Sequence, residues 1–258
     1  MDIKYTPKYF KDRIPEWKRK KDPILTRIFY RPLSFFFASL CANCGINANT
    51  VSYYSFVLAI ISCFLYLIPQ KEWHIIAAIF VNIWLLLDCI DGNLARSYRR
   101  QPFGEFADGI SSYILVGLLC TTMGFSIYYT GGLFVEAGNS WVILIGALSS
   151  SADTMMRLIY QKYKATEREM ADMGVLSIEQ DKRIDHAHVD SFRVRMESEM
   201  GIGGFLPLAI LIATIFNALD LIVIYCFIYY VFSCVIASFL YIRKSIKAAK
   251  KYQDKMPQ

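Results

Sequence analysis

Two aspartates, Asp88 and Asp91, directly follow the apolar segment NIWLLL. Because they are three residues apart, both carboxylates lie on one face of a helix, about 5–6 Å from each other. Two anions at that separation repel unless a cation lies between them. Carboxylate oxygens without histidine or cysteine favour a hard divalent ion such as Mg²⁺, Mn²⁺ or Ca²⁺. Since an ionisable residue in an apolar span is costly, the pair predicts a functional metal site.

The residues that follow could complete a ligand cavity beside this pair. Gly92 and Ala95 are small, so a ligand can approach the helix backbone there. Arg96 stands at the expected helix end, where a guanidinium can meet a phosphate. Gly104 opens the next helix, and Asp108 lies on the face that looks back across the loop. We expect these groups to converge on one cavity.

Each of these residues also has a purely structural interpretation. Asp91 and Arg96 could simply end a helix, and Asp108 could form an ion pair with Arg99 or Arg100. Such explanations suit one residue at a time and leave the joint occurrence of the set unexplained. The functional interpretation is therefore preferred for the set.

Together these residues resemble the signature of the CDP-alcohol phosphotransferase family. That signature reads DxxDGxxAR, then seven or eight residues, then GxxxDxxxD. From Asp88 to Ser112 the chain reads DCIDGNLAR, SYRRQPF and GEFADGIS. Upstream, NANTVSYYS resembles the family's PNxxT element, with Ala48 in place of proline and Ser52 in place of threonine.

The resemblance implies an activity, a cofactor and site residues. Enzymes of this family transfer the phosphoalcohol part of a CDP- or CMP-linked donor to an acceptor hydroxyl and release CMP, in phospholipid or glycan head-group synthesis. The implied cofactor is Mg²⁺ or Mn²⁺, and the implied assembly is a homodimer. The implied roles are metal ligation by Asp88, Asp91 and Asp108, catalysis by Asp108 with phosphate contact by Arg96, and nucleotide binding by Asn49, Ser52, Gly92, Ala95, Arg96 and Gly104.

Ser112 departs from the family pattern. It stands where the family has a fourth aspartate, which is usually assigned as metal ligand and general base. A serine cannot accept a proton at neutral pH as a carboxylate can, and general acid–base help is typically worth roughly 10²–10⁴-fold in rate. The enzyme could use another base, its acceptor could be acidic or carry its own anion, or the site could bind nucleotide without turnover. We favour an active enzyme with an altered acceptor.

Other polar groups are weaker candidates. Asp153 could supply the missing base, but an i, i+4 ion pair with Arg157 is the simpler interpretation. Cys41 and Cys44 form a CxxC with no second Cys or His pair nearby to complete a zinc site. The run DHAHVD at 185–190 fits a solvated face better than a metal site. His74, beside Trp73, is assigned an anchoring position at the membrane interface and no chemistry.

The elements that carry these residues are expected to be membrane helices. The 258-residue chain is 55% hydrophobic, and its apolar residues cluster in long runs. We predict an all-α integral membrane fold in which an interfacial amphipathic helix over 23–45, kinked or restarted near Pro32, precedes six spans. The expected spans are 50–69, 73–95, 106–129, 141–161, 202–218 and 220–242.

The polar segments divide the chain into three parts. Residues 1–45 form a cytoplasmic or interfacial segment, 46–245 a catalytic membrane domain with a cytoplasmic insert at 162–201, and 246–258 a basic tail. The first apolar run begins too late for a signal peptide, so nothing is expected to be cleaved.

The distribution of basic residues predicts the orientation. If the N-terminus is cytoplasmic, all 28 lysines and arginines except Lys71 lie on the cytoplasmic side of the six-span plan. Both termini and the site are therefore expected to be cytoplasmic. The net charge of +6 is better explained by topology and anionic lipid head groups than by nucleic acid. A cation-coupled transporter remains a rival, but it predicts carboxylates near the bilayer midplane on several helices.

Overall fold

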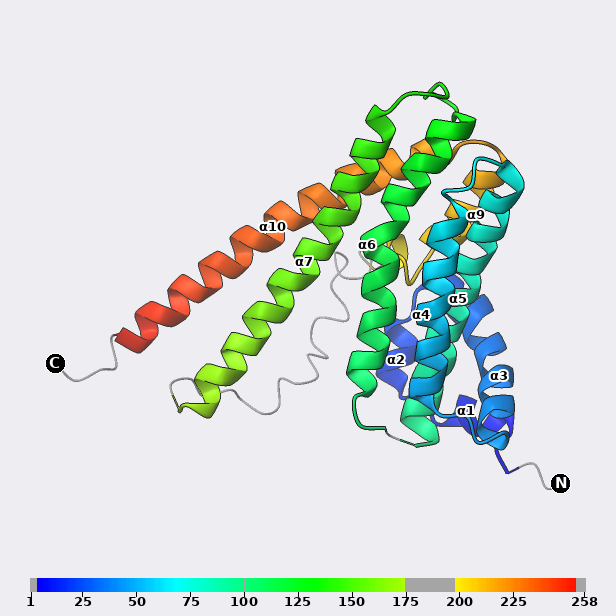
Figure 1. Cartoon of the computed structure of the whole chain (residues 1–258). Helices are drawn as coiled ribbons and strands as arrows, with labels where there is room; N and C mark the ends of the chain where they lie inside the picture. Colours follow the sequence, from blue (N-terminus) through cyan, green and yellow to red (C-terminus); the bar gives the residue numbers. More distant parts are fainter. Residues whose placement is uncertain (1–3, 100, 175–197, 254–258) are drawn as a thin grey trace.

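The computed structural model describes residues 4–99, 101–174 and 198–253, and this part of the chain is all-α (Figure 1). Short helices α1 and α2 lead through a π-helical turn, η1, into α3. Longer helices α4 to α7 follow, and α9 and α10 complete the fold. The bounds are α1 Pro7–Asp12, α2 Glu16–Lys21, η1 Thr26–Tyr30, α3 Arg31–Asn43, α4 Ala48–Leu65, α5 Lys71–Ser97, α6 Gly104–Thr130, α7 Trp141–Asp172, α9 Leu206–Ile215 and α10 Leu219–Gln253.

Five of the described helices, α4, α5, α6, α7 and α10, are long and apolar enough to cross a membrane. The chain is therefore an integral membrane protein. The sixth expected span, 202–218, contains α9, which has only 10 residues. At 1.5 Å per residue such a helix covers roughly half of a 30 Å hydrocarbon core. Six complete spans thus remain a prediction.

Helices α4, α5 and α6 run alongside one another, while α7 and α10 lean away from them toward the C-terminal end (Figure 1). Their common core contains the buried side chains Tyr66, Trp84, Leu115 and Met123. Small residues allow the close approach of α6 and α7. A Cβ on Gly146 would lie 2.3 Å from the carbonyl oxygen of Cys120, so any side chain there would push the two helices apart.

The N-terminal segment is fixed to the body of the protein by hydrogen bonds. Glu199 accepts from the backbone N–H of Ile24, and the Thr26 hydroxyl donates to the carbonyl of Gly203. Helix α3 begins at Arg31, directly after η1, with Pro32 in its first turn. Its contact with α5 brings this segment beside the residues singled out above.

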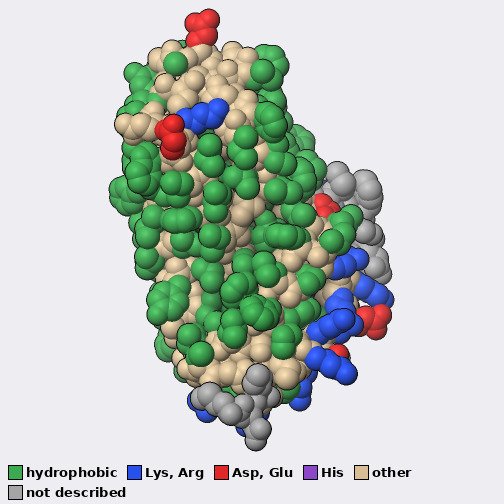
Figure 2. All heavy atoms as spheres, turned by 90° about the vertical axis from the view of Figure 1, so that its right-hand side faces the viewer, with side chains coloured by type: hydrophobic (Ala, Val, Ile, Leu, Met, Phe, Trp, Pro, Cys, Tyr) green, Lys and Arg blue, Asp and Glu red, His purple; other side chains and the backbone are tan. Residues whose placement is uncertain are grey.

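Hydrophobic side chains cover the broad middle of the face in Figure 2, and lysine and arginine side chains gather toward its lower part. This lower part corresponds to the end of the bundle that carries α1 and α2 in Figure 1. An apolar surface bounded by charge is the arrangement that a lipid bilayer requires. The interfacial location of α3 remains a prediction.

At the opposite end of the bundle, Asp220 fixes the loop between α6 and α7. Its buried carboxylate accepts hydrogen bonds from the backbone N–H groups of Leu133, Phe134 and Val135. Gly132 has no room for a side chain, because an added Cβ would lie 2.4 Å from Cγ of Asp220. This aspartate thus has a structural role.

Candidate active site

The structure brings the three signature aspartates together. Asp88 and Asp91 come from the C-terminal half of α5, and Asp108 comes from the second turn of α6. One carboxylate oxygen from each lies within 4.8 Å of the other two. Asp91 is buried, Asp88 is half-buried and Asp108 is exposed, so the cluster opens on one side. No described cation forms an ion pair with any of the three.

Helix α4 orients the most buried member of this cluster. The Ser52 hydroxyl donates to Oδ2 of Asp91 at 2.6 Å. Behind it, Ser55 donates to the carbonyl of Ser52 and is also hydrogen-bonded to Ser111 on α6. The indole of Trp84 donates to the same Ser111 hydroxyl. A chain of buried hydrogen bonds therefore ties α4, α5 and α6 together directly behind the carboxylates.

The loop between α5 and α6 is fixed by Asn49. Its side-chain N–H donates to the carbonyl of Pro102 at 2.9 Å, while its amide oxygen is buried without a partner in the described structure. A Cβ on Gly104 would lie 3.6 Å from that oxygen. Phe103, with φ of 58°, makes the left-handed turn that starts α6. Asn49 and Gly104 are thus neighbours.

Arg96 folds back along its own helix. A Cβ on Gly92 would lie 3.0 Å from Nη2 of Arg96, so the glycine leaves the space that the guanidinium fills. Nη2 also donates to Oδ1 of Asn93 at 3.3 Å. Within the described residues no carboxylate lies within ion-pair distance of Arg96. Its positive charge is therefore available to a ligand.

Comparison with known families assigns this arrangement. The family model described as CDP-alcohol phosphatidyltransferase matches residues 46–178, about half of the chain. The chain belongs to this CDP-alcohol phosphatidyltransferase family. The matched region contains the carboxylate cluster, Ser52, Asn49 and Arg96. A search of curated proteins finds no match.

Ser112 lies one turn beyond Asp108 on α6. Its hydroxyl donates to the carbonyl of Gly109 in its own helix at 3.1 Å, and its side chain is half-buried. The described structure gives it no hydrogen bond to Asp88, Asp91 or Asp108. It therefore leaves the acidic cluster with three carboxylates.

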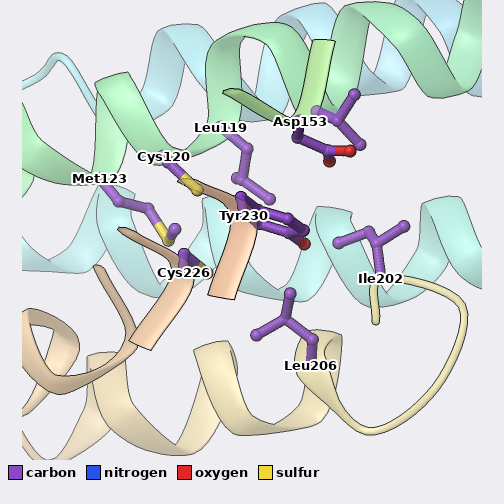
Figure 3. Close-up of a pocket in the computed structure, with 9 residues that line it drawn as sticks. Leu119, Cys120, Met123, Asp153, Ile202, Leu206, Cys226 and Tyr230 are labelled. Carbon is purple, nitrogen blue, oxygen red and sulfur yellow. The ribbon is translucent and has the colours of Figure 1, made fainter. Parts of the chain in front are cut away.

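Asp153 belongs to a different place in the structure. It forms an ion pair with Arg157, with Nε 2.9 Å from Oδ1, which confirms the simpler interpretation of this residue. Its second oxygen is buried, has no partner and faces a cavity of about 10 Å³ that Tyr230 and Leu206 also line (Figure 3). Such a volume has room for about one water molecule and none for a nucleotide. As a replacement base Asp153 remains untested.

The remaining sequence candidates do not join the site. Cys41 and Cys44 are free thiols, and the described residues contain no cluster of metal-ligating side chains other than the three aspartates. His74 is buried and hydrogen-bonded to Ser126 and to the carbonyl of Ile68, so its side chain is not exposed to lipid head groups. Its expected position at the membrane interface stays a prediction. The run 185–190 lies outside the described residues.

Sequence reasoning missed three polar residues beside the site, Asp22, Arg31 and Asn93. All three are buried. Burial opposes ionisation of the Asp22 carboxyl, but the hydrogen bond from Arg31 and the charges of Lys18 and Arg31 outweigh it and lower the pKa. The sequence signal available for these residues was the oppositely charged pair Asp22 and Arg31, nine residues apart in an interrupted apolar segment.

Proposed function

We propose that this chain is a metal-dependent transferase that moves a substituted phosphoryl group from a CDP- or CMP-linked donor to an acceptor hydroxyl, releasing CMP. The convergence of Asp88, Asp91 and Asp108 carries the proposal. Family membership supports the reaction class. The charge of the site bears on which donor head group and which acceptor it would bind.

The donor set fits a hard divalent ion, for which we propose Mg²⁺ or Mn²⁺. The three oxygens come from carboxylates, and their mutual separation of at most 4.8 Å suits one or two ions. Three carboxylates without a paired cation would repel one another, so a metal would relieve that repulsion. When bound, the ion would neutralise the diphosphate and stabilise the leaving group.

The chain's own residues would bind and orient the substrates. Arg96 would contact a donor or acceptor phosphate, because its guanidinium lies next to the cluster and has no carboxylate partner there. Ser52 would hold Asp91 in position through their hydrogen bond. Asn49, Gly92, Ala95 and Gly104 would line the nucleotide side of the site, where Asn49 offers a buried, unpartnered amide oxygen to a ligand donor.

The missing fourth carboxylate bears on the acceptor. Ser112 is neutral and its proton is engaged by the carbonyl of Gly109. The site therefore carries one negative charge fewer than the family pattern, which favours an acceptor or donor that brings an additional anion. A catalytically silent nucleotide-binding relative is the alternative that Ser112 supports.

The decisive test is a donor panel. Purified protein would be incubated with CMP- and CDP-linked donors and with neutral or phosphorylated alcohols, and CMP release would be followed with and without Mg²⁺. Metal-dependent CMP release with at least one pair supports the transferase. Nucleotide binding without turnover across the panel supports the silent relative, and absence of nucleotide binding contradicts both.

Replacement of Ser112 by aspartate tests the altered-acceptor interpretation. The added carboxylate would return a negative charge to the space beside Asp108, so Ser112→Asp should leave turnover unchanged or reduce it. If serine were only a damaged base, turnover should instead rise by roughly tenfold or more. Steady-state CMP release distinguishes these outcomes, and Ser112→Asn serves as a control for side-chain size without charge.

We propose that both termini and the site face the cytoplasm, since the basic residues concentrate on one side of the expected spans. The placement can be tested with single introduced cysteines in a background lacking Cys41, Cys44 and Cys234, the native cysteines that are not buried. An impermeant thiol reagent should label Asn139→Cys in intact cells, and Lys247→Cys only after permeabilisation. Both positions are exposed. The reverse labelling pattern would contradict the proposed orientation.

A further inference from the structure

Asn93 connects Arg96 to the N-terminal segment. Its amide oxygen accepts from Nη2 of Arg96 at 3.3 Å and from Nη1 of Arg31 at 3.2 Å. Asn93 is 1% exposed, so its hydrogen bond with Arg31 is buried, whereas its hydrogen bond with the exposed side chain of Arg96 is partly buried. A single neutral amide on α5 therefore contacts two guanidinium groups, that of Arg31 on α3 and that of Arg96 on α5 itself.

The donors and acceptors around the Asn93 amide fix its orientation. The Ser34 hydroxyl donates its only proton to the carbonyl of Arg31 at 2.8 Å, so its oxygen is left to accept from Nδ2 of Asn93 at 2.8 Å. With the amino group engaged by Ser34, the amide oxygen must face the two guanidiniums. Arg31 and Ser34 thus set the direction from which Arg96 is held.

Asp22 reduces the electrostatic cost of bringing the two arginines together. Its carboxylate accepts hydrogen bonds from Nε and Nη2 of Arg31, each at 2.8 Å. Nζ of Lys18 lies 3.2 Å from its Oδ1. This bidentate pair is buried, with side-chain exposures of 3% and 8%. Arg31 is thereby ion-paired, whereas no described carboxylate lies within ion-pair distance of Arg96. A neutral asparagine can then orient Arg96 without cancelling the charge that a phosphate would need.

We propose that Asn93 and Arg31 are positioning residues that hold Arg96 toward the phosphate of the bound nucleotide, with Asp22 locking Arg31. The inference rests on the proposed function, because it assigns the nucleotide phosphate to Arg96. Asp22 and Arg31 lie outside the region matched by the family model, 46–178. The N-terminal segment therefore takes part in substrate binding as well as in anchoring the protein.

The test measures how full-length protein binds Mg²⁺–CDP and Mg²⁺–pyrophosphate, by calorimetry in detergent. Arg31→Met should weaken both ligands about tenfold, as expected for loss of an oriented charge-assisted contact. Arg96→Met should weaken them at least as much. Since Arg31 acts through Arg96, the double variant should bind no more weakly than Arg96→Met alone. Lys20→Met, which removes an exposed cation paired with Glu16, is the matched control.

A second variant keeps the test valid if Arg31→Met fails to fold, because that change leaves the buried Asp22 with Lys18 as its only described ion-pair partner. Asn93→Asp retains an acceptor for both arginines but gives Arg96 a carboxylate partner, so it should weaken pyrophosphate binding about tenfold as well. Independent, additive effects of Arg31 and Arg96, or unchanged affinity in Asn93→Asp, would overturn the proposal.

Pyrophosphate separates this inference from the proposed function. Wild-type protein that binds Mg²⁺–pyrophosphate but not Mg²⁺–CDP would contradict the nucleotide-dependent transferase, while the comparison of Arg31, Asn93 and Arg96 variants would still decide the positioning role. Wild-type protein that binds neither ligand would show that both proposals are wrong.

Discussion

Asp91→Asn is expected to abolish CMP release and metal-dependent protection by nucleotide against thermal unfolding. Asp91 is the most buried member of the carboxylate cluster, and its Oδ2 accepts a hydrogen bond from the Ser52 hydroxyl. The amide keeps the shape of the side chain but removes its charge. Loss of a residue that only orients a metal ligand typically costs roughly 10–100-fold, so removal of a ligand should exceed a hundredfold.

Two companion variants make that result specific. Ser52→Ala leaves the Asp91 carboxylate in place and removes only its hydrogen bond. It should reduce activity by roughly 10–100-fold, the range typical for loss of a hydrogen-bond partner of a metal ligand. Glu105→Gln makes the same carboxylate-to-amide change on an exposed residue one turn before Asp108 and should behave like the wild type. Full CMP release by Asp91→Asn would remove the metal-site proposal.

Gly146→Ala is expected to cause the largest loss of stability among single methyl additions between α6 and α7. The new Cβ would lie 2.3 Å from the Cys120 carbonyl oxygen and 3.3 Å from Cα of Thr121. Both neighbours are backbone atoms, so the helices must separate along their contact. Overpacking of this kind typically costs about 1–3 kcal/mol, and the rigidity of the backbone places this case at or above the upper end.

Gly109→Ala is the matched control for that variant. It lies on α6, the helix that Gly146 of α7 contacts, but its added Cβ would meet only the Tyr113 ring, at 3.8 Å, which is ordinary contact. Alanine is favoured over glycine in a helix by up to about 1 kcal/mol, so this variant should be neutral or slightly stabilising. Thermal unfolding in detergent compares the two. Equal melting temperatures would contradict the close packing of α6 against α7.

The local part of the site could be predicted because it depends on helix periodicity. Asp88 and Asp91 are one turn apart, and Asp108 follows a short loop, so their approach requires only two helices joined in the expected way. The same reasoning led to Gly92 as a place where a ligand could approach the helix backbone. It did not show that the neighbour is the guanidinium of Arg96. Spacing predicts a shared face, whereas rotamers depend on what packs against that face.

The hydrogen bonds of Asn93 with Arg31 and Arg96 could not be predicted from helix periodicity. Arg31 and Asn93 are 62 residues apart, and Asp22 reaches Arg31 only because the chain turns between α2 and α3. Hydrogen bonds of that separation depend on how α3 docks on α5, which no local pattern specifies. Asp153 shows the opposite case, since its partner Arg157 is one turn away and was correctly expected.

The sequence by itself determined the membrane helices and the family signature, because apolar length and helical spacing are local properties. It also predicted the aspartate cluster, but not the hydrogen bond by which Ser52 of α4 orients Asp91. Only the tertiary structure decided that Ser52 holds Asp91, that Asn93 faces two arginines and that His74 is buried. Each of these depends on contact between helices distant in sequence, where packing selects one partner among many polar residues of similar type.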